Sequence, residues 1–386
     1  IDPIVEGGRE WRAGLPNVDF YDQYARFVGS HTVELTDGTR LQGRQIVVAA
    51  GSRAVLPSVP GIDSAKVYTN DNVMRLDELP ARMVVIGGGV IAAEFSHVFS
   101  AFGTEVTQLN RSSRLLRGVD EEIVARFEEA ASKQWNIVKD ASLSEIRENA
   151  DGSVTVVAKR TTENGEELLE IPADAVLVAT GRRPNTDTLN AKNYFDVQEG
   201  GQLSVDKYQR VLYNGAPVPG VYALGDVSSR YQLKHVANHE ARVVQHNLSH
   251  PEDLRASDHR YVPGAVFSNP QIAVVGMTEE QARQAAEREG FEITVKAQNF
   301  GDTAYGWAME DKIGLCKLIA RKDNGELLGA HLVGEESSVL IQPLLQAMSF
   351  GMDARTLARG QYWIHPALTE IVENALLGLE FDEPAN

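Results

Sequence analysis

The sequence has a single cysteine, Cys316, among 386 residues, and no apolar run that approaches the length of a membrane span. One cysteine excludes an internal disulfide framework and fits a reducing cytosol, so we expect a cytoplasmic protein. Basic residues are also scarce, because 37 lysines and arginines stand against 54 acidic residues and leave a formal net charge of -17. This charge argues against nucleic acid or an anionic membrane as the main partner.

One pattern occurs twice along the chain. A turn dipeptide lies between alternating apolar runs at Asp37-Gly38 and again at Asn164-Gly165, and such dipeptides predict β-hairpins. Each hairpin precedes an apolar strand, which we expect to end at Gly51 in the first copy and at Gly181 in the second. The repetition predicts two related domains.

A glycine fingerprint precedes the second copy. The apolar strand MVVI is followed by GGGVIA and then by a helix-like stretch that ends at Gly103, which is G-x-G-x-x-A in the setting that the motif requires. Gly87 permits the tight turn, Gly89 lets the backbone approach a pyrophosphate, and Ala92 lets helix and strand pack closely. The phosphates are expected at the positive end of the helix. The predicted binding residues of this turn are Gly87, Gly89, Val90 and Ile91.

The residues after the next strand indicate which dinucleotide binds. The strand EVTQL ends at Asn110, where an NAD-binding fold carries an acidic residue for the ribose 2′-hydroxyl. Three arginines follow, namely Arg111, Arg114 and Arg117. A missing acid and nearby arginines favour a 2′-phosphate and therefore NADPH. The alternatives are a solvated basic turn and Glu105 as an NAD-type acid.

The first copy has no such beginning, because no strand with a glycine fingerprint precedes residue 32. We therefore expect the front of the first nucleotide domain to be missing from the sequence. After the second copy the chain is expected to return to the first domain, with a strand that ends at Gly225-Asp226 and a helix over residues 234–248. From about residue 258, hairpin signals such as Asn324-Gly325 mix with helices in an α+β pattern suited to self-association.

The predicted fold class is therefore α/β. It has two Rossmann-like dinucleotide-binding domains, of which the first is N-terminally incomplete and interrupted by the second, and a C-terminal α+β dimerisation domain. The predicted boundaries are 1–80 and 191–255 for the first domain, 81–190 for the second and 256–386 for the third.

These elements, in this order, resemble the flavoprotein disulfide reductases, the family of glutathione reductase, lipoamide dehydrogenase and mercuric reductase. The matching stretches span essentially the whole chain and are IVVAAGS, GGGVIAAEF, VLVATGRRPN, VYALGDV, VFSNPQIAVVGMT and HPALTE. Within the family, HVANHEARVVQHNL and QYWIHPALTEIVENALLGL are most similar to the mycothione reductase subfamily.

The resemblance implies two cofactors, FAD and NADPH, and a homodimer whose active site is shared across the interface. It implies a small-molecule disulfide as substrate, with mycothione as the expected one. It also implies an N-terminal FAD fingerprint and a redox-active CxxxxC, and the sequence contains neither. Cys316 lies in the alternating stretch GLCKLI and is predicted to be a buried structural thiol.

The resemblance also assigns cofactor residues. Positions matching Arg111 and Arg117 bind the 2′-phosphate in this family, and Asp226 matches an aspartate that accepts hydrogen bonds from the FAD ribityl chain. Glu94 is expected near nicotinamide and flavin, with a helix-surface carboxylate as the alternative. The other expected cofactor-binding positions are Gly51, Gly181, Lys234, His235 and Ala237. No metal site is predicted.

His365-Pro366 is followed by Glu370 in a helix predicted to run toward Leu379. A proline at the first helical position would place His365 at the cap, with its ring free to project. In the family, this histidine pairs with the glutamate five residues on and acts in the partner subunit's site as the general acid/base of thiol exchange. Glu373 is an alternative partner.

The predicted function is NADPH-dependent, FAD-containing reduction of a low-molecular-weight disulfide. A lipoamide dehydrogenase-like enzyme is one alternative, although it would need NAD, which Asn110 and Arg111 disfavour. A non-catalytic, self-associating NADPH-binding protein is the other alternative, and the missing CxxxxC favours it.

Overall fold

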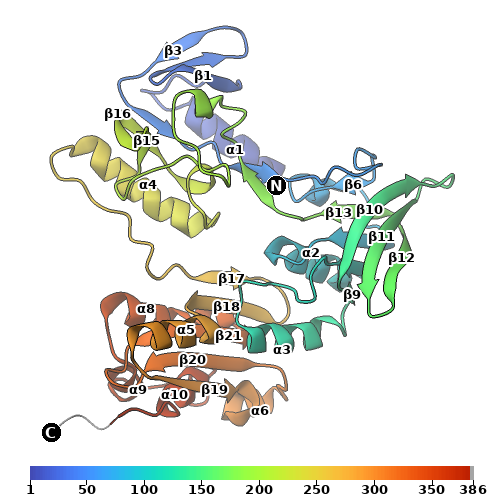
Figure 1. The fold of residues 1–386 in the computed structure, drawn as a ribbon, viewed down its shortest axis with the longest axis vertical. Coiled ribbons are helices and arrows are strands. Elements are labelled where there is room, and N and C mark those ends of the chain that lie inside the picture. The colour runs from blue at the N-terminus through green and yellow to red at the C-terminus, as the bar shows by residue number, and fades with distance from the viewer. Residues whose placement is uncertain (383–386) are drawn as a thin grey trace. The chain divides into compact units, whose positions relative to one another are not determined.

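The computed structural model describes residues 1–382, so the last four residues of the predicted 256–386 domain lie outside the described part. The chain forms two compact units, and each is built from two segments (Figure 1). Unit 1 comprises residues 1–53 and 183–257, and unit 2 comprises residues 54–182 and the described part of 258–386. The predicted domain boundaries stay predictions.

Unit 1 contains two three-stranded sheets. The predicted hairpin at Asp37-Gly38 is confirmed, because β2 and β3 pair in antiparallel fashion around it, and β1 adds a third strand. In the second sheet, β4 pairs in parallel with β16, and β15 pairs with β16 on the other side. The bounds in this unit are α1 Asp2–Ala13, β1 Ala25–Gly29, β2 Thr32–Leu35, β3 Arg40–Gln42, β4 Ile46–Val48, η2 Ala191–Asn193, β15 Arg210–Tyr213, β16 Ala216–Ala223, η3 Gly225–Val227 and α4 Lys234–Ser249.

The pairing of β4 with β16 brings together residues that are about 170 positions apart in the chain. Residues of both strands belong to a core in which Phe27 and Phe195 pack edge to face, with ring centroids 4.9 Å apart. Helix α4 follows this sheet and starts and ends within one residue of the predicted range. Strands β5 (Ser52–Ala54) and β14 (Arg182–Pro184) lie where the chain passes from one unit to the other.

Unit 2 contains a five-stranded parallel sheet in the order β6-β13-β7-β8-β9. Strand β7 is almost entirely buried, as expected for a parallel strand covered on both faces. This strand order is that of a dinucleotide-binding fold, which binds its ligand at the carboxyl ends of the central strands. The bounds are β6 Val67–Tyr68, η1 Val73–Arg75, β7 Arg82–Ile86, α2 Val90–Ala101, β8 Glu105–Leu109, α3 Glu121–Ala131, β9 Asn136–Val138 and β13 Ala175–Val178.

A three-stranded antiparallel sheet is inserted in the chain between β9 and β13 of the parallel sheet. The predicted hairpin at Asn164-Gly165 is confirmed, because β11 (Val154–Thr162) pairs with β12 (Gly165–Ala173) up to Thr162 and Gly165. Strand β10 (Ala141–Glu148) pairs with the other edge of β11. Apolar residues of this sheet join the parallel sheet in one buried cluster, so the two sheets share a core.

The remainder of unit 2 is a five-stranded antiparallel sheet in the order β17-β18-β21-β20-β19, covered by helices (Figure 1). The predicted turn at Asn324-Gly325 joins β20 to β21. The bounds are β17 Gly264–Val266, β18 Gln271–Gly276, α5 Glu279–Glu289, β19 Ile293–Asn299, η4 Phe300–Asp302, α6 Ala304–Ala308, β20 Leu315–Arg321, β21 Leu327–Gly334, α7 Ser337–Leu340, α8 Gln342–Phe350, α9 Ala354–Arg359 and α10 Glu370–Leu377.

Strand β20 shows the alternation expected of a sheet packed on both faces. Cys316, Leu318 and Ala320 belong to the core formed with helices α7 to α10. Burial raises the pKa of the Cys316 thiol, so the prediction of a buried structural cysteine is confirmed. Among residues 1–382, no helix has the length and hydropathy needed to cross a membrane.

Candidate active site

A cavity of about 700 Å³ opens at the carboxyl ends of β7, β8 and β13. The turn after β7 contributes Gly87, Gly89 and Val90, and the turn after β13 contributes Gly181. This is where a doubly wound sheet of this strand order binds dinucleotides. Four of the predicted cofactor residues therefore lie together, whereas Ile91 does not line the cavity.

The glycine turn has the geometry that its sequence predicts. Gly87 has φ +140°, and a Cβ there would overlap the carbonyl oxygen of Ala179 in the turn after β13. At Gly89 a Cβ would meet nothing within 4 Å, so the backbone is open to an approaching ligand. Gly89 is also the N-cap of α2 and makes no side-chain capping bond. The first amide N–H groups of the helix can therefore bind a phosphate.

The strand after α2 ends at Leu109, one residue before the predicted end at Asn110, and the loop that follows lines the same cavity. We call residues 111–117 the arginine loop, because it carries Arg111, Arg114 and Arg117. Arg111 and Arg117 are exposed. Glu105 begins β8 and thus lies at the opposite end of the strand from the cavity, which weakens its case as an NAD-type acid.

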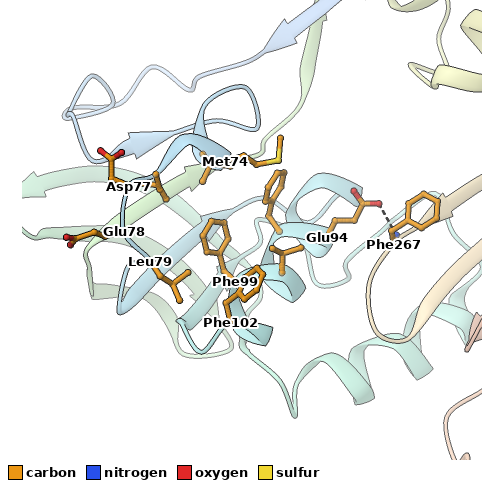
Figure 2. A pocket seen from close by; sticks show the side chains of 12 residues that line it. Met74, Asp77, Glu78, Leu79, Glu94, Phe99, Phe102 and Phe267 are labelled. Carbon is orange, nitrogen blue, oxygen red and sulfur yellow. Dashed lines mark hydrogen bonds between the residues drawn. The ribbon is translucent and has the colours of Figure 1, made fainter. Parts of the chain in front are cut away.

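Glu94 lines a second cavity, of about 550 Å³, whose wall is mostly aromatic and aliphatic (Figure 2). Its Oε1 accepts a hydrogen bond from the backbone N–H of Phe267 at 2.9 Å. Burial raises the pKa of Glu94, and the bond from Phe267 only partly opposes this. The carboxyl therefore connects α2 to the segment after β17. Its expected role near nicotinamide and flavin stays a prediction.

In unit 1, Asp226 lies in a short 3-10 turn at the end of the second sheet. Its Oδ2 accepts a hydrogen bond of 2.7 Å from the hydroxyl of Ser52, which follows Gly51. Within residues 1–382 no bond is made to Oδ1, so that oxygen is available to a ligand hydroxyl. The neighbouring Gly225 donates its N–H to the buried carboxylate of Glu240 at 2.7 Å, which fixes the turn.

Helix α4 begins close to this turn in the chain. Lys234 and His235 are exposed in its first turn, and the Cβ of Ala237 would be 3.4 Å from a Cβ at Gly225. An available carboxylate oxygen and a helix start with an adjacent cation suit a ligand that carries hydroxyls and phosphates. The residues of unit 1 therefore fit the FAD assignment, although binding by each residue stays a prediction.

The pairing of His365 with Glu370 is direct. His365 Nδ1 lies 2.7 Å from Glu370 Oε1, and the backbone N–H of Ala367 donates to Oε2 at 3.3 Å. The bond from His365 is the main reason that the pKa of Glu370 lies below its usual value, and burial opposes it. The imidazole is 69% exposed, while the carboxylate is 18% exposed. The structure therefore favours Glu370 over Glu373 as the partner.

The predicted capping of His365 was wrong. Helix α10 begins at Glu370, so Pro366 lies in a turn ahead of the helix and His365 is not at its cap. The helix ends at Leu377 instead of running to Leu379. The ring is oriented by the carboxylate at the first helical position. The other ring nitrogen, Nε2, makes no hydrogen bond within residues 1–382.

A buried ionic cluster that we did not predict connects the start of α3 to β20 and to the start of α5. Lys317 Nζ lies 3.0 Å from Asp120, 3.2 Å from Glu122 and 2.7 Å from Glu279. The Lys317 side chain is 6% exposed and that of Asp120 is 3% exposed. Acidic residues at the starts of helices and a lysine in an apolar strand can be seen in the sequence. Only the tertiary fold, however, brings them into contact.

The contacts within the cluster shift the pKa of Asp120, Glu279 and Lys317. Burial alone would raise the pKa of Asp120 and of Glu279, but hydrogen bonds, including those from Lys317, outweigh it and hold both pKa values below normal. Burial would likewise lower the pKa of Lys317, yet the three carboxylates raise it. Asp120, Glu279 and Lys317 are therefore charged at neutral pH.

Comparisons with known proteins agree with this arrangement. Residues 4–241 match the pyridine nucleotide-disulphide oxidoreductase family, and residues 262–376 match the dimerisation domain of that family. The chain is 48% identical over 388 aligned residues to mycothione reductase of Mycobacterium tuberculosis, covering 98% of this chain and 81% of that protein.

Two further relatives show how wide the family is. Dihydrolipoyl dehydrogenase 2 of Arabidopsis thaliana chloroplasts is 30% identical over 96% of this chain and 65% of its own length. The HOCl-induced flavoprotein disulfide reductase RclA of Escherichia coli, solved as a Cu(II) complex, superposes with a TM-score of 0.85 at 27% identity. That match covers 97% of this chain and 82% of RclA.

The family uses FAD and NAD(P)H, so the predicted pair of cofactors is confirmed at the level of the family. The predicted fold class is confirmed as well. The dimerisation domain suggests a homodimer, and a small-molecule disulfide substrate fits the family. The chain belongs to the pyridine nucleotide-disulphide oxidoreductase family of flavoprotein disulfide reductases.

Proposed function

We propose that this protein is an NADPH-dependent flavoprotein that reduces mycothione, the disulfide of mycothiol, to two mycothiol molecules. The reaction consumes one NADPH and one proton for each disulfide. The observation that carries the proposal is the 48% identity to mycothione reductase over 98% of the chain. A cytoplasmic location and a homodimer with a shared site are part of the same proposal.

The preference for NADPH is supported by the cavity at the glycine turn. Gly87, Gly89 and the start of α2 would hold the pyrophosphate, while Arg111 and Arg117 would bind the 2′-phosphate. Among residues 1–382, no carboxylate lines the cavity, so none of these residues places an acidic group there to repel a 2′-phosphate.

The flavin would be held by unit 1, where the Oδ1 of Asp226 can accept from a ribityl hydroxyl and the first turn of α4 can face the phosphates. Bound FAD would supply the means of passing two electrons from the nicotinamide to a dithiol. Ser52 orients Asp226 through its 2.7 Å hydrogen bond.

His365 would supply the proton in thiol exchange. Glu370 accepts a hydrogen bond from Nδ1, which fixes the ring and the tautomer that leaves Nε2 for proton transfer. In the proposed dimer, Nε2 takes the proton of the attacking thiol of the partner subunit and gives it to the thiolate that leaves the substrate disulfide. The imidazole is 69% exposed, so it is accessible to the active site of a partner subunit in the proposed dimer.

Reduction through a dithiol needs two cysteines, and residues 1–386 hold only Cys316, which is buried. We therefore propose the activity for a protein that holds this dithiol in addition to the residues described. The cysteine content also favours a second candidate, in which residues 1–386 alone bind NADPH and self-associate without turnover. A native mass spectrum separates the two, because it reports chain mass, bound FAD and subunit number together.

The proposed reaction is tested by following NADPH oxidation at 340 nm with mycothione, lipoamide and glutathione disulfide, each at matched concentrations. Mycothione should give the highest kcat/KM. Faster turnover of lipoamide with NADH would replace the proposal with a dihydrolipoyl dehydrogenase activity. If the protein carries FAD and the dithiol but reduces none of the three disulfides, the proposed function is wrong.

A further inference from the structure

Asn110 directly follows β8 and has a buried side chain, whose amide holds the arginine loop. Its Nδ2 donates to the carbonyl oxygen of Ser112 at 2.7 Å and to that of Arg114 at 3.0 Å. Both protons of the amide are thereby used on the backbone of the loop. An aspartate has the same shape but no proton to donate at neutral pH, so it could make neither bond.

The middle glycine of the glycine turn packs against the same amide. A Cβ on Gly88 would lie 2.6 Å from Cγ of Asn110 and would overlap its Oδ1. The carbonyl oxygen of Gly88 also accepts a hydrogen bond of 2.7 Å from the N–H of Leu116. Because the backbone of Gly88 lies outside the left-handed region, it is the contact with Asn110 that requires a glycine here.

A third contact holds the middle of the loop. The N–H of Leu115 donates to Oε1 of Glu128 at 2.8 Å, and Oε2 of this carboxylate pairs with Lys139 at 2.7 Å. Leu115 and Leu116 are buried, whereas Arg111 and Arg117 are exposed on either side of them. The backbone is therefore fixed while the two guanidinium groups remain accessible.

We propose that Asn110 is a positioning residue that determines the preference for NADPH over NADH, acting through the backbone that carries Arg111 and Arg117. The inference rests on the proposed function, since it assumes that these arginines bind the 2′-phosphate. A fixed loop binds the phosphate more tightly because less conformational entropy is lost on binding. Gly88 is the steric partner of Asn110 in this arrangement.

The direct test is Asn110→Asp, which removes two hydrogen-bond donors and adds one negative charge at nearly the same shape. Binding of NADPH and NADH is followed by nicotinamide fluorescence. NADPH affinity should fall at least about tenfold, because two bonds to the loop are lost and a charge faces carbonyl oxygens. NADH affinity should stay within about twofold. An equal loss for both nucleotides, or no loss, overturns the proposal.

The pH dependence separates positioning from general disruption. A protonated aspartate regains one O–H donor. The ratio of variant to wild-type affinity for NADPH should therefore recover toward one as the pH falls, whereas a misfolded variant would not recover. The ratio is used because protonation of the 2′-phosphate itself affects both proteins alike. A ratio that stays constant with pH contradicts the proposal.

Separate measurements test the NADPH preference of the wild-type protein and the positioning role of Asn110. Equal affinity of the wild-type protein for NADPH and NADH would overturn the proposed NADPH preference. Trypsin cleavage after Arg111 and Arg117 without any nucleotide reports on the loop alone. Faster cleavage in Asn110→Asp supports the positioning role, and unchanged cleavage overturns it, whichever nucleotide the wild type prefers.

A double-mutant cycle tests the contact with Gly88. Gly88→Ala should weaken NADPH binding in the wild-type background, because the methyl group displaces the amide of Asn110. In an Asn110→Ala background, where the overlap is removed, the same change should cost little. Additive losses in the double variant would show that the two residues act separately and would contradict the proposed arrangement.

Discussion

Replacing Arg111 and Arg117 with alanine removes the two exposed cations at the ends of the arginine loop. Each charge-assisted hydrogen bond to a phosphate contributes about 1.5–3 kcal/mol when fully formed. Because both side chains are exposed, solvent screening reduces their joint contribution to about 2.7 kcal/mol, which is a hundredfold in affinity. The double variant should therefore raise KM for NADPH about a hundredfold and leave KM for NADH nearly unchanged.

The assay is steady-state oxidation of each nucleotide at fixed disulfide concentration. Arg288→Ala is the matched control, because this arginine is exposed, belongs to α5 and does not line the cavity. It removes one exposed positive charge without touching the loop. Raising the salt concentration should increase KM for NADPH in the wild type more than in the double variant, since salt screens exposed charges. Equal effects of the double substitution on both nucleotides would refute the reasoning.

Three further predictions test other parts of the structure. Lys317→Met should cost about 3–5 kcal/mol in urea unfolding at pH 7, because it leaves buried carboxylates without a cation. The cost should shrink at acid pH, since stability from carboxyls with a lowered pKa is present above their unfolded-state pKa and is lost as the pH falls through the folded-state value. Gly87→Ala should lower the melting temperature, because it adds about 1–3 kcal/mol of backbone strain and an overlap with the carbonyl oxygen of Ala179. Gly89→Ala should leave the melting temperature unchanged and weaken nucleotide binding. Glu370→Gln should lower kcat for disulfide reduction about tenfold to a hundredfold without changing KM for NADPH, because it disturbs only the partner of His365. An unchanged kcat would remove Glu370 from the proton-transfer step.

Local signals predicted much of the fold. The two turn dipeptides identified both hairpins, and the apolar run before Gly87 identified β7, the central strand of the parallel sheet. These features depend on neighbours in the chain, because a two-residue turn and a strand-turn-helix are encoded within about twenty residues. The position of Asn110 next to the end of β8 followed from the same local reasoning.

Features set by distant contacts were missed or misread. The turn at Pro366 could not be distinguished from a helix start, because the helix begins only where Glu370 bonds to His365 and to the backbone of Ala367. The need for glycine at position 88 was invisible, since it arises from Asn110, 22 residues further along the chain.

The ionic cluster was also missed because it depends on contacts between residues that are distant in the chain. Asp120 and Lys317 are 197 residues apart, and each is unremarkable in its own stretch of sequence. Their meeting depends on how α3 and α5 pack on β20, which no local pattern specifies. Sequence reasoning therefore located the site through its turn and loop chemistry, but it could not identify the contacts that hold the site in shape.

The central claim is that the protein uses NADPH to reduce mycothione, and the most direct measurement counts the thiols released for each NADPH consumed. The protein carrying FAD and its redox dithiol is incubated anaerobically with limiting NADPH and excess mycothione, and thiols are titrated at completion. We expect two thiols to be released for each NADPH consumed. NADPH consumption without thiol release, or thiol release supported equally well by NADH, would contradict it.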